Sequence, residues 1–211
     1  MDTTISELRE RAAELRSGAL RLAEGTGMLD LIRAAIGRVE VVGSVDLDLM
    51  VWPDVDLYTR LGAGERARFL ALLPALHDRV EARGYSFVRV NFNDEYRRPG
   101  NRFGCGLYFG MKILDPAGER LWKVDLWAWD AATFDRKLAE HRQLVRDLAA
   151  VDRDLVLRIK DAVHLRPEYR GTLTSMDVYA FAIAGRGQTL AEFDEFLARR
   201  GDPVEPESAR E

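Results

Sequence analysis

The predicted fold of this chain depends most on one stretch of the sequence, Gly43-Ser44-Val45-Asp46-Leu47-Asp48-Leu49-Met50-Val51-Trp52-Pro53-Asp54-Val55-Asp56-Leu57. A Gly-Ser turn ends a short β-branched run. After a spacer of nine residues, Val45 to Pro53, Asp54 and Asp56 alternate with Val55 and Leu57. Such alternation is typical of a strand with two different faces, because successive side chains point to opposite sides. We therefore expect Asp54 and Asp56 on one face of a strand, and Val55 and Leu57 on the other.

A third carboxylate, Asp125, lies in a similar setting, Lys123-Val124-Asp125-Leu126-Trp127. If this later strand lies beside the strand of Asp54 and Asp56, the three carboxylates converge. Like charges held close together repel and raise one another's pKa. A hard cation such as Mg²⁺ removes that penalty and prefers oxygen ligands. The sequence therefore predicts a metal site at these three positions.

The rest of the chain predicts the elements around this pair of strands. Helical periodicity is clear over 4–24 and 65–83, and alternation predicts further strands over 85–92, 105–114 and 119–129. The expected fold class is α+β, with a small mixed β-sheet flanked by helices.

After Asp130, which is a candidate N-cap, the pattern is helical up to residue 165 with a break near Val151-Asp152. Two more helices are expected to begin at Thr174 and Thr189. We therefore expect a core over residues 1–130, a helical subdomain over 131–200 and, over 201–211, a Pro- and Glu-rich disordered tail.

The composition excludes several classes of protein. Hydrophobic residues make up 47% and charged residues 31% of the 211 residues, a balance typical of soluble domains. The net charge of -4 argues against a dedicated duplex nucleic-acid binder. The single Cys105 excludes an intrachain disulfide, and the three histidines are too scattered for a zinc site. Without a signal-like or membrane-spanning apolar run, a cytoplasmic location and no membrane partner are expected.

The turn Gly43-Ser44, the pair Asp54 and Asp56, and the later Asp125 together resemble the motif of the nucleotidyltransferase superfamily, typified by DNA polymerase beta and the aminoglycoside nucleotidyltransferases. The resemblance covers residues 38–129, and the helical part is similar only in general arrangement. It implies that the three carboxylates bind two Mg²⁺ ions, and that Asp125 also lies close to the attacking hydroxyl and acts as its base. It further implies that Gly43 and Ser44 hold phosphate oxygens of an NTP co-substrate.

The chain departs from the commonest form of this motif in two ways. Asp46 and Asp48 form a second Asp-x-Asp pair inside the spacer between Ser44 and Asp54, and a proline precedes Asp54. One residue between Ser44 and Asp46 leaves no room for a turn that folds back into a strand. Asp54 and Asp56 are therefore the predicted metal pair.

Two lysines are further candidates for this site. Lys123 shares a face with Asp125 by alternation, so it is predicted to contact a phosphate or the acceptor, with a plain salt bridge as the equal alternative. Lys160 and Arg158 lie on a helix where the resemblance implies a basic side chain for the triphosphate. A solvated helix face is the favoured alternative for both.

The resemblance implies a Mg²⁺-dependent enzyme that moves a nucleoside monophosphate from an NTP, with ATP as the first candidate, to a hydroxyl of an acceptor, and releases pyrophosphate. The acidic balance favours a small-molecule acceptor over long nucleic acid. The alternatives are a toxin–antitoxin-type nucleotidyltransferase that acts on a protein or on tRNA, and a catalytically silent nucleotide-binding module. The sequence does not indicate an oligomeric state.

Overall fold

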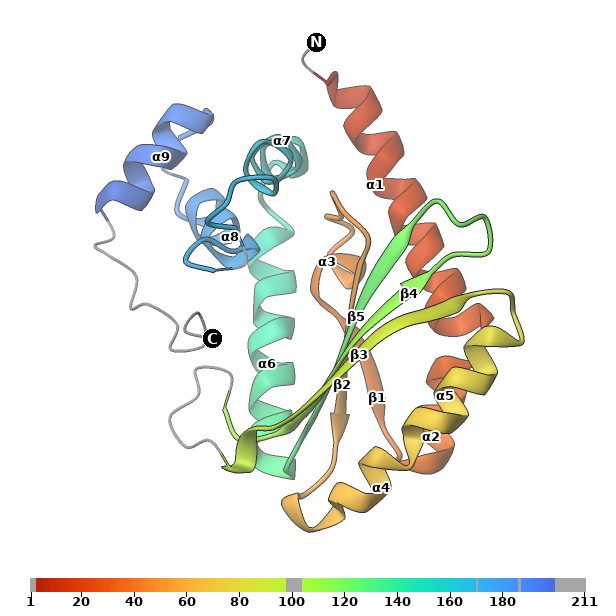
Figure 1. Ribbon diagram of the computed structural model, residues 1–211. Coiled ribbons are helices and arrows are strands. Elements are labelled where there is room, and N and C mark those ends of the chain that lie inside the picture. Colours follow the sequence, from red (N-terminus) through yellow and green to blue (C-terminus); the bar gives the residue numbers. More distant parts are fainter. Residues whose placement is uncertain (1–2, 98–103, 170, 186, 200–211) are drawn as a thin grey trace.

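The computed structural model describes residues 3–97, 104–169, 171–185 and 187–199. Its centre is a five-stranded sheet with the strand order β1-β2-β5-β4-β3 (Figure 1). β2 and β5 run parallel, and every other neighbouring pair is antiparallel. The strands are β1 (Val39–Val42), β2 (Asp54–Arg60), β3 (Ser86–Asp94), β4 (Leu107–Leu114) and β5 (Leu121–Trp129).

Helices lie on both sides of the sheet, with α1, α2, α4 and α5 on one side and α6 to α9 on the other (Figure 1). The helices before and among the first strands are α1 (Ile5–Leu20), α2 (Met28–Ala35), the single turn α3 (Gly43–Asp46), α4 (Arg66–Leu70) and α5 (Leu72–Glu81). The later helices are α6 (Ala131–Leu148), α7 (Arg153–Val163), α8 (Ser175–Ile183) and α9 (Leu190–Arg199).

The main core lies between one face of the sheet and helices α1, α2 and α5. Alternation places Phe109 and Met111 of β4 and Val124 and Leu126 of β5 on this face, where none is exposed. α1 approaches the sheet closely at Gly18, where a Cβ would lie 2.6 Å from the ring of Trp122. The other face of these strands carries polar residues and a smaller hydrophobic cluster, in which Trp129 packs on Phe134 and Leu138 of α6.

A second core joins α7, α8 and α9 to two parts of the N-terminal region. Ala12 of α1 and both Leu49 and Val51, which precede β2, pack in the same cluster as Phe181 and Phe193. The predicted division at residue 130 stays a prediction, although α6 begins at Ala131. The segment that leads into β2 is thus held by the C-terminal helices as well as by the sheet.

The predicted α+β class is confirmed, and most predicted elements lie within a few residues of the observed ones. The predicted helix over 65–83 is instead two helices, α4 and α5, after a short turn over Ala63–Glu65. Cys105 precedes β4 instead of lying in it. Much of the predicted loop over 93–104, and the predicted tail over 201–211, lie outside the described residues. Within the described residues, no helix combines the length and the apolar character that crossing a membrane requires.

Candidate metal-binding site

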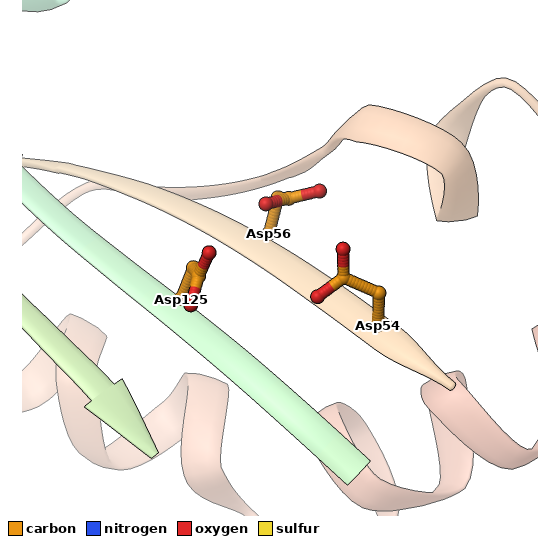
Figure 2. A group of neighbouring side chains, drawn as sticks. All are labelled: Asp54, Asp56 and Asp125. Atoms are coloured by element: carbon orange, nitrogen blue, oxygen red, sulfur yellow. The ribbon is translucent and has the colours of Figure 1, made fainter. Parts of the chain in front are cut away.

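The parallel pairing of β2 with β5 brings the three predicted carboxylates together. The register sets Asp54 opposite Lys123 and Asp56 opposite Asp125. One oxygen from each of Asp54, Asp56 and Asp125 lies within 4.8 Å of the others. Figure 2 shows Asp54 and Asp56 on one strand and Asp125 on its neighbour, with the three carboxylates on the same side. The expected convergence is therefore present.

The site is electrostatically unfavourable as it stands. Burial raises the pKa of Asp56 well above its ordinary value, and the charges of Asp54 and Asp125 raise it further. Lys123 forms an ion pair with Asp125, and its Nζ lies 3.5 Å from Asp54 Oδ1. Burial alone would lower the pKa of Lys123, but the neighbouring carboxylates outweigh burial and raise it. The Lys123 ammonium therefore stays charged and offsets part of the repulsion.

The donor set fits Mg²⁺. The group consists of three carboxylates, with no imidazole or thiolate among them, and hard divalent cations favour such oxygen ligands. All three side chains project from paired strands, so their separation is fixed by the sheet and not by a loop. A divalent cation would also relieve the repulsion that raises the pKa of Asp56.

The Gly-Ser turn passes directly beside this group. β1 ends at Val42, which is paired with Asp56, and the next residue, Gly43, has a φ of 66°. A Cβ on Gly43 would overlap the Asp56 carboxylate. Glycine is therefore required here both by its left-handed backbone and by the close approach of the carboxylate. Ser44 follows in α3 and is half-buried.

Tyr108 is a site residue that the sequence analysis missed. Its hydroxyl donates a hydrogen bond of 2.8 Å to Asp125 Oδ1. Gly110 lies opposite Asp125 in the sheet, and a Cβ there would overlap the Tyr108 hydroxyl. Burial, together with Asp125, raises the pKa of Tyr108, so the hydroxyl keeps its proton. Alternation in β4 could have placed Tyr108 on the polar face, but its partner depends on the strand register.

Lys160 corrects a sequence-based expectation. Instead of lying on a solvated helix face, it is fully buried in α7, and its Nζ donates to the carbonyl oxygen of Leu49 and, over 3.0 Å, to the hydroxyl of Tyr179. Burial lowers the pKa of Lys160 to about 7, against the opposing influence of Asp54 and Asp56. Arg158, two residues earlier in the same helix, is exposed as expected. A contact between Lys160 and a nucleotide stays a prediction.

The second Asp-x-Asp pair is engaged elsewhere. Asp46 Oδ2 accepts a hydrogen bond of 2.7 Å from His141 Nε2 of α6. Asp48 lies 3.0 Å from Arg153 of α7 and has a φ of 54°. These contacts tie the spacer to the C-terminal helices, and the metal-type grouping among the described residues uses Asp54 and Asp56. Asp130 caps α6, as predicted, by accepting from the backbone of Thr133.

Comparisons with solved structures return proteins that transfer nucleotides. The chain is similar in structure to nucleotidyltransferases. A structure described as the RNA terminal uridylyl transferase Cid1 matches with a TM-score of 0.43 and 16% identity, over 82% of this chain and 51% of that one. A structure of mtPAP in complex with CTP matches with a TM-score of 0.46 and 20% identity, over 86% of this chain and 41% of that one. A structure of the non-canonical poly(A) polymerase complex GLD-2–GLD-3 matches with a TM-score of 0.46 and 15% identity, over 97% of this chain and 66% of that one.

The chain spans less than two thirds of the length of the chains that it matches. No family model matches the sequence, and no curated protein matches it. TM-scores below 0.5, with identities of 20% or less, leave the assignment of a function to the geometry of the site itself.

Proposed function

We propose that this protein is a Mg²⁺-dependent nucleotidyltransferase that moves a nucleoside monophosphate from an NTP to a hydroxyl of an acceptor and releases pyrophosphate. The observation that carries this proposal is the convergence of Asp54, Asp56 and Asp125 beside the turn at Gly43. Three carboxylates fixed by a sheet, next to a backbone that can approach a ligand closely, suit phosphoryl chemistry that depends on positioning and charge neutralisation.

Each residue has a definite task in this proposal. Asp54, Asp56 and Asp125 would hold the Mg²⁺ ions, two in number by the superfamily resemblance. When bound, these ions neutralise the triphosphate and lower the pKa of the acceptor hydroxyl. Gly43 and Ser44 would hold phosphate oxygens through backbone N–H groups and the Ser44 hydroxyl. Lys123, beside Asp54 and Asp125, would add positive charge next to the reacting groups. Lys160 would support the nucleotide site from behind, by holding the segment that leads into β2.

Asp125 would also receive the proton of the acceptor hydroxyl. The hydroxyl oxygen then forms a bond to the α-phosphorus, and the bond from that phosphorus to the pyrophosphate oxygen breaks. Tyr108 holds one oxygen of Asp125 by its hydrogen bond, which fixes the orientation of the carboxylate towards the acceptor. Tyr108 is thus a positioning residue.

The proposed acceptor is a small molecule. The net charge of -4 supports this choice over long nucleic acid, because nucleic-acid binders usually carry a basic excess. ATP is the first nucleotide to test. The competing outcomes are transfer to a protein or to tRNA, and nucleotide binding without any transfer.

The decisive experiment is thermal unfolding with each NTP, with and without Mg²⁺. A ligand at 100 times its dissociation constant stabilises by about 2.7 kcal/mol, a shift that is easily measured. We expect a Mg²⁺-dependent shift in the wild type and in Asp46→Asn, and none in Asp54→Asn/Asp56→Asn. The proposal fails if no nucleotide shifts the wild type.

Turnover is then measured as pyrophosphate release over a panel of acceptors, with the NTP that gives the largest shift. Release that requires a small alcohol supports the small-molecule acceptor. Release that requires tRNA or a protein replaces that part of the proposal. A melting shift without release from any acceptor would indicate the silent nucleotide-binding module.

A further inference from the structure

On the face of the sheet that carries the carboxylates, a row of residues crosses four strands. Asp54 of β2 is paired with Lys123 of β5, Lys123 with Lys112 of β4, and Lys112 with Arg89 of β3. Three adjacent strands therefore contribute three cations at one level of the sheet. Because neighbouring strands lie about 4.8 Å apart, the backbone positions of Lys123 and Arg89 are about 10 Å apart.

This row is not explained by packing. Like charges directly opposite each other in a sheet are destabilising, and the main core lies on the other face of these strands, with Met111 and Val124 fully buried there. Lys123 is balanced by Asp54 and Asp125. Lys112 and Arg89 continue the row one and two strands further from those carboxylates, towards β3.

The row is also open to a ligand at its outer end. Arg89 is exposed, Lys112 is half-buried, and the side chain of Lys123 is 26% exposed. α6 packs on the end of β5 through Trp129, Phe134 and Leu138. Trp129 is six residues beyond Lys123 along β5, so this contact covers a different part of the face.

The carboxylates separate this row from the Gly-Ser turn. Gly43 approaches Asp56 from the side of β1, whereas Lys112 and Arg89 lie beyond β5 on the opposite side. The proposed function places the NTP phosphates at Gly43 and Ser44. The cation row therefore lies on the side of Asp125 that is left for the acceptor.

We propose that Lys112 and Arg89, together with Lys123, bind a phosphate group of the acceptor, and that the acceptor is a small phosphorylated alcohol. This inference rests on the proposed function and specifies its substrate class. Guanidinium and ammonium groups bind phosphate through charge-assisted hydrogen bonds, which a neutral alcohol cannot replace. The row begins two residues from Asp125 on the same strand, so the phosphate would lie a few bonds from the reacting hydroxyl. It ends at β3, the edge strand, and the chain carries a net charge of -4, which favours a small molecule over a polynucleotide.

The test compares alcohols with their own phosphate esters. The pairs are glycerol with glycerol 3-phosphate, ribose with ribose 5-phosphate, and adenosine with adenosine 5′-monophosphate, and a single-stranded oligoribonucleotide with a free 3′-hydroxyl is included. Binding is measured calorimetrically with Mg²⁺ and a non-hydrolysable NTP analogue, and transfer is measured as pyrophosphate release. The variant is Lys112→Gln/Arg89→Gln. The matched control, Arg83→Gln/Arg142→Gln, removes the same charge from two exposed positions, one before β3 and one on α6.

We expect at least one phosphate ester to bind ten or more times more tightly than its parent alcohol. Lys112→Gln/Arg89→Gln should remove that advantage and raise the KM of the ester at least tenfold with a smaller change in kcat, and the control should retain the advantage. The inference is overturned if no pair shows a preference for the ester, if the control loses as much as the variant, or if the oligoribonucleotide alone binds. The melting shift with Mg²⁺ and NTP is measured on the same samples, so a failure of the proposed function is seen separately.

Discussion

Asp56 is the most constrained residue of the site. It is paired with Val42 on one side and with Asp125 on the other, and the Gly43 backbone lies against its carboxylate. Its pKa is raised by burial and by two neighbouring carboxylates. A carboxylate held under these conditions has a cost for the free protein, and that cost is relieved when a cation binds.

The two Asp-x-Asp pairs should respond differently to neutral substitution. Asp54→Asn or Asp56→Asn should lower kcat/KM by more than about 100-fold. Loss of a residue that only orients a metal ligand already costs up to about 100-fold, and the loss of a ligand itself should cost more. Asp46→Asn should keep most of the activity, because Asp46 contacts His141 of α6 and not the carboxylate group. Steady-state pyrophosphate release compares the three variants. An equal loss in Asp46→Asn would mean that the metal pair has been assigned wrongly.

Gly43→Ala should damage activity more than stability. The added Cβ would overlap the Asp56 carboxylate and would occupy a left-handed backbone conformation, at a cost of about 1–2 kcal/mol. We expect kcat/KM to fall at least tenfold while the protein still folds. Gly118→Ala is the control, because Gly118 also has a positive φ but has open space around it. Urea unfolding and pyrophosphate release are measured for both, and equal losses of activity would argue against the site at Asp56.

At the scale of single elements, β2 and α7 do most to position the site. β2 carries two carboxylates and lies between β1, which leads into the Gly-Ser turn, and β5, which carries the third. α7 supports the segment before β2, because Lys160 donates to the carbonyl oxygen of Leu49. The start of β2 is therefore held from both the sheet and the helical side.

Lys160 should make stability depend on pH. Its pKa is lowered by burial to about 7, whereas an unfolded lysine titrates near about 10.4. Between these values the unfolded chain binds a proton that the folded chain has released, so the free energy of unfolding rises with pH, by at most about 1.4 kcal/mol per pH unit. The stabilising contribution is complete above the unfolded pKa and is lost as the pH falls towards 7.

The measurement is urea unfolding of the wild type and Lys160→Met between pH 6 and 9.5, without metal. The difference in the free energy of unfolding, wild type minus variant, should increase with pH over this window. Arg158→Met, which alters an exposed position of the same helix, should show no such trend relative to the wild type. A constant difference across the window would show that Lys160 does not titrate as stated.

At the scale of the whole molecule, the two largest hydrophobic cores do not include the carboxylate group. The largest core lies between the sheet and α1, α2 and α5, and a second core joins α7, α8 and α9 to α1. The carboxylates lie on the other face of the sheet. Folding is therefore expected to depend on the cores and not on a metal.

Metal removal should leave the protein folded. We expect chelation by EDTA to keep the native circular dichroism spectrum, and Mg²⁺ to raise the Tm by several degrees, since about 1 kcal/mol shifts the Tm of a chain of this size by about 2–4 °C. In Asp54→Asn/Asp56→Asn the Mg²⁺ response should disappear, while the Tm in EDTA should not fall, because the repulsion between carboxylates is reduced. Unfolding of the wild type on chelation would contradict this separation.

Local patterns in the sequence were enough to predict most helices and strands and the acidic face of two strands. Alternation around Asp54 and Asp56 and around Asp125 predicted two strands with an acidic face, and the spacing from Ser44 excluded Asp46 as part of the pair. The two strands are present, because side-chain alternation in a strand is a local property of the backbone. The choice of Asp54 and Asp56 over Asp46 as metal ligands stays a prediction. The caps at Asp130 and Thr174 were likewise local, since each depends on a side chain within one helical turn.

The order of the strands in the sheet, and the residues that face each other across them, follow from the folded structure and not from local patterns. That Asp56 faces Asp125, that Gly110 makes room for Tyr108, and that Lys112 and Arg89 continue the row of Lys123 all follow from strand register. Lys160 was expected in solvent and is buried, because the environment of a helix face depends on the elements that pack against it. Register and packing join residues that are far apart in the chain, and no local pattern of the sequence specifies such pairs.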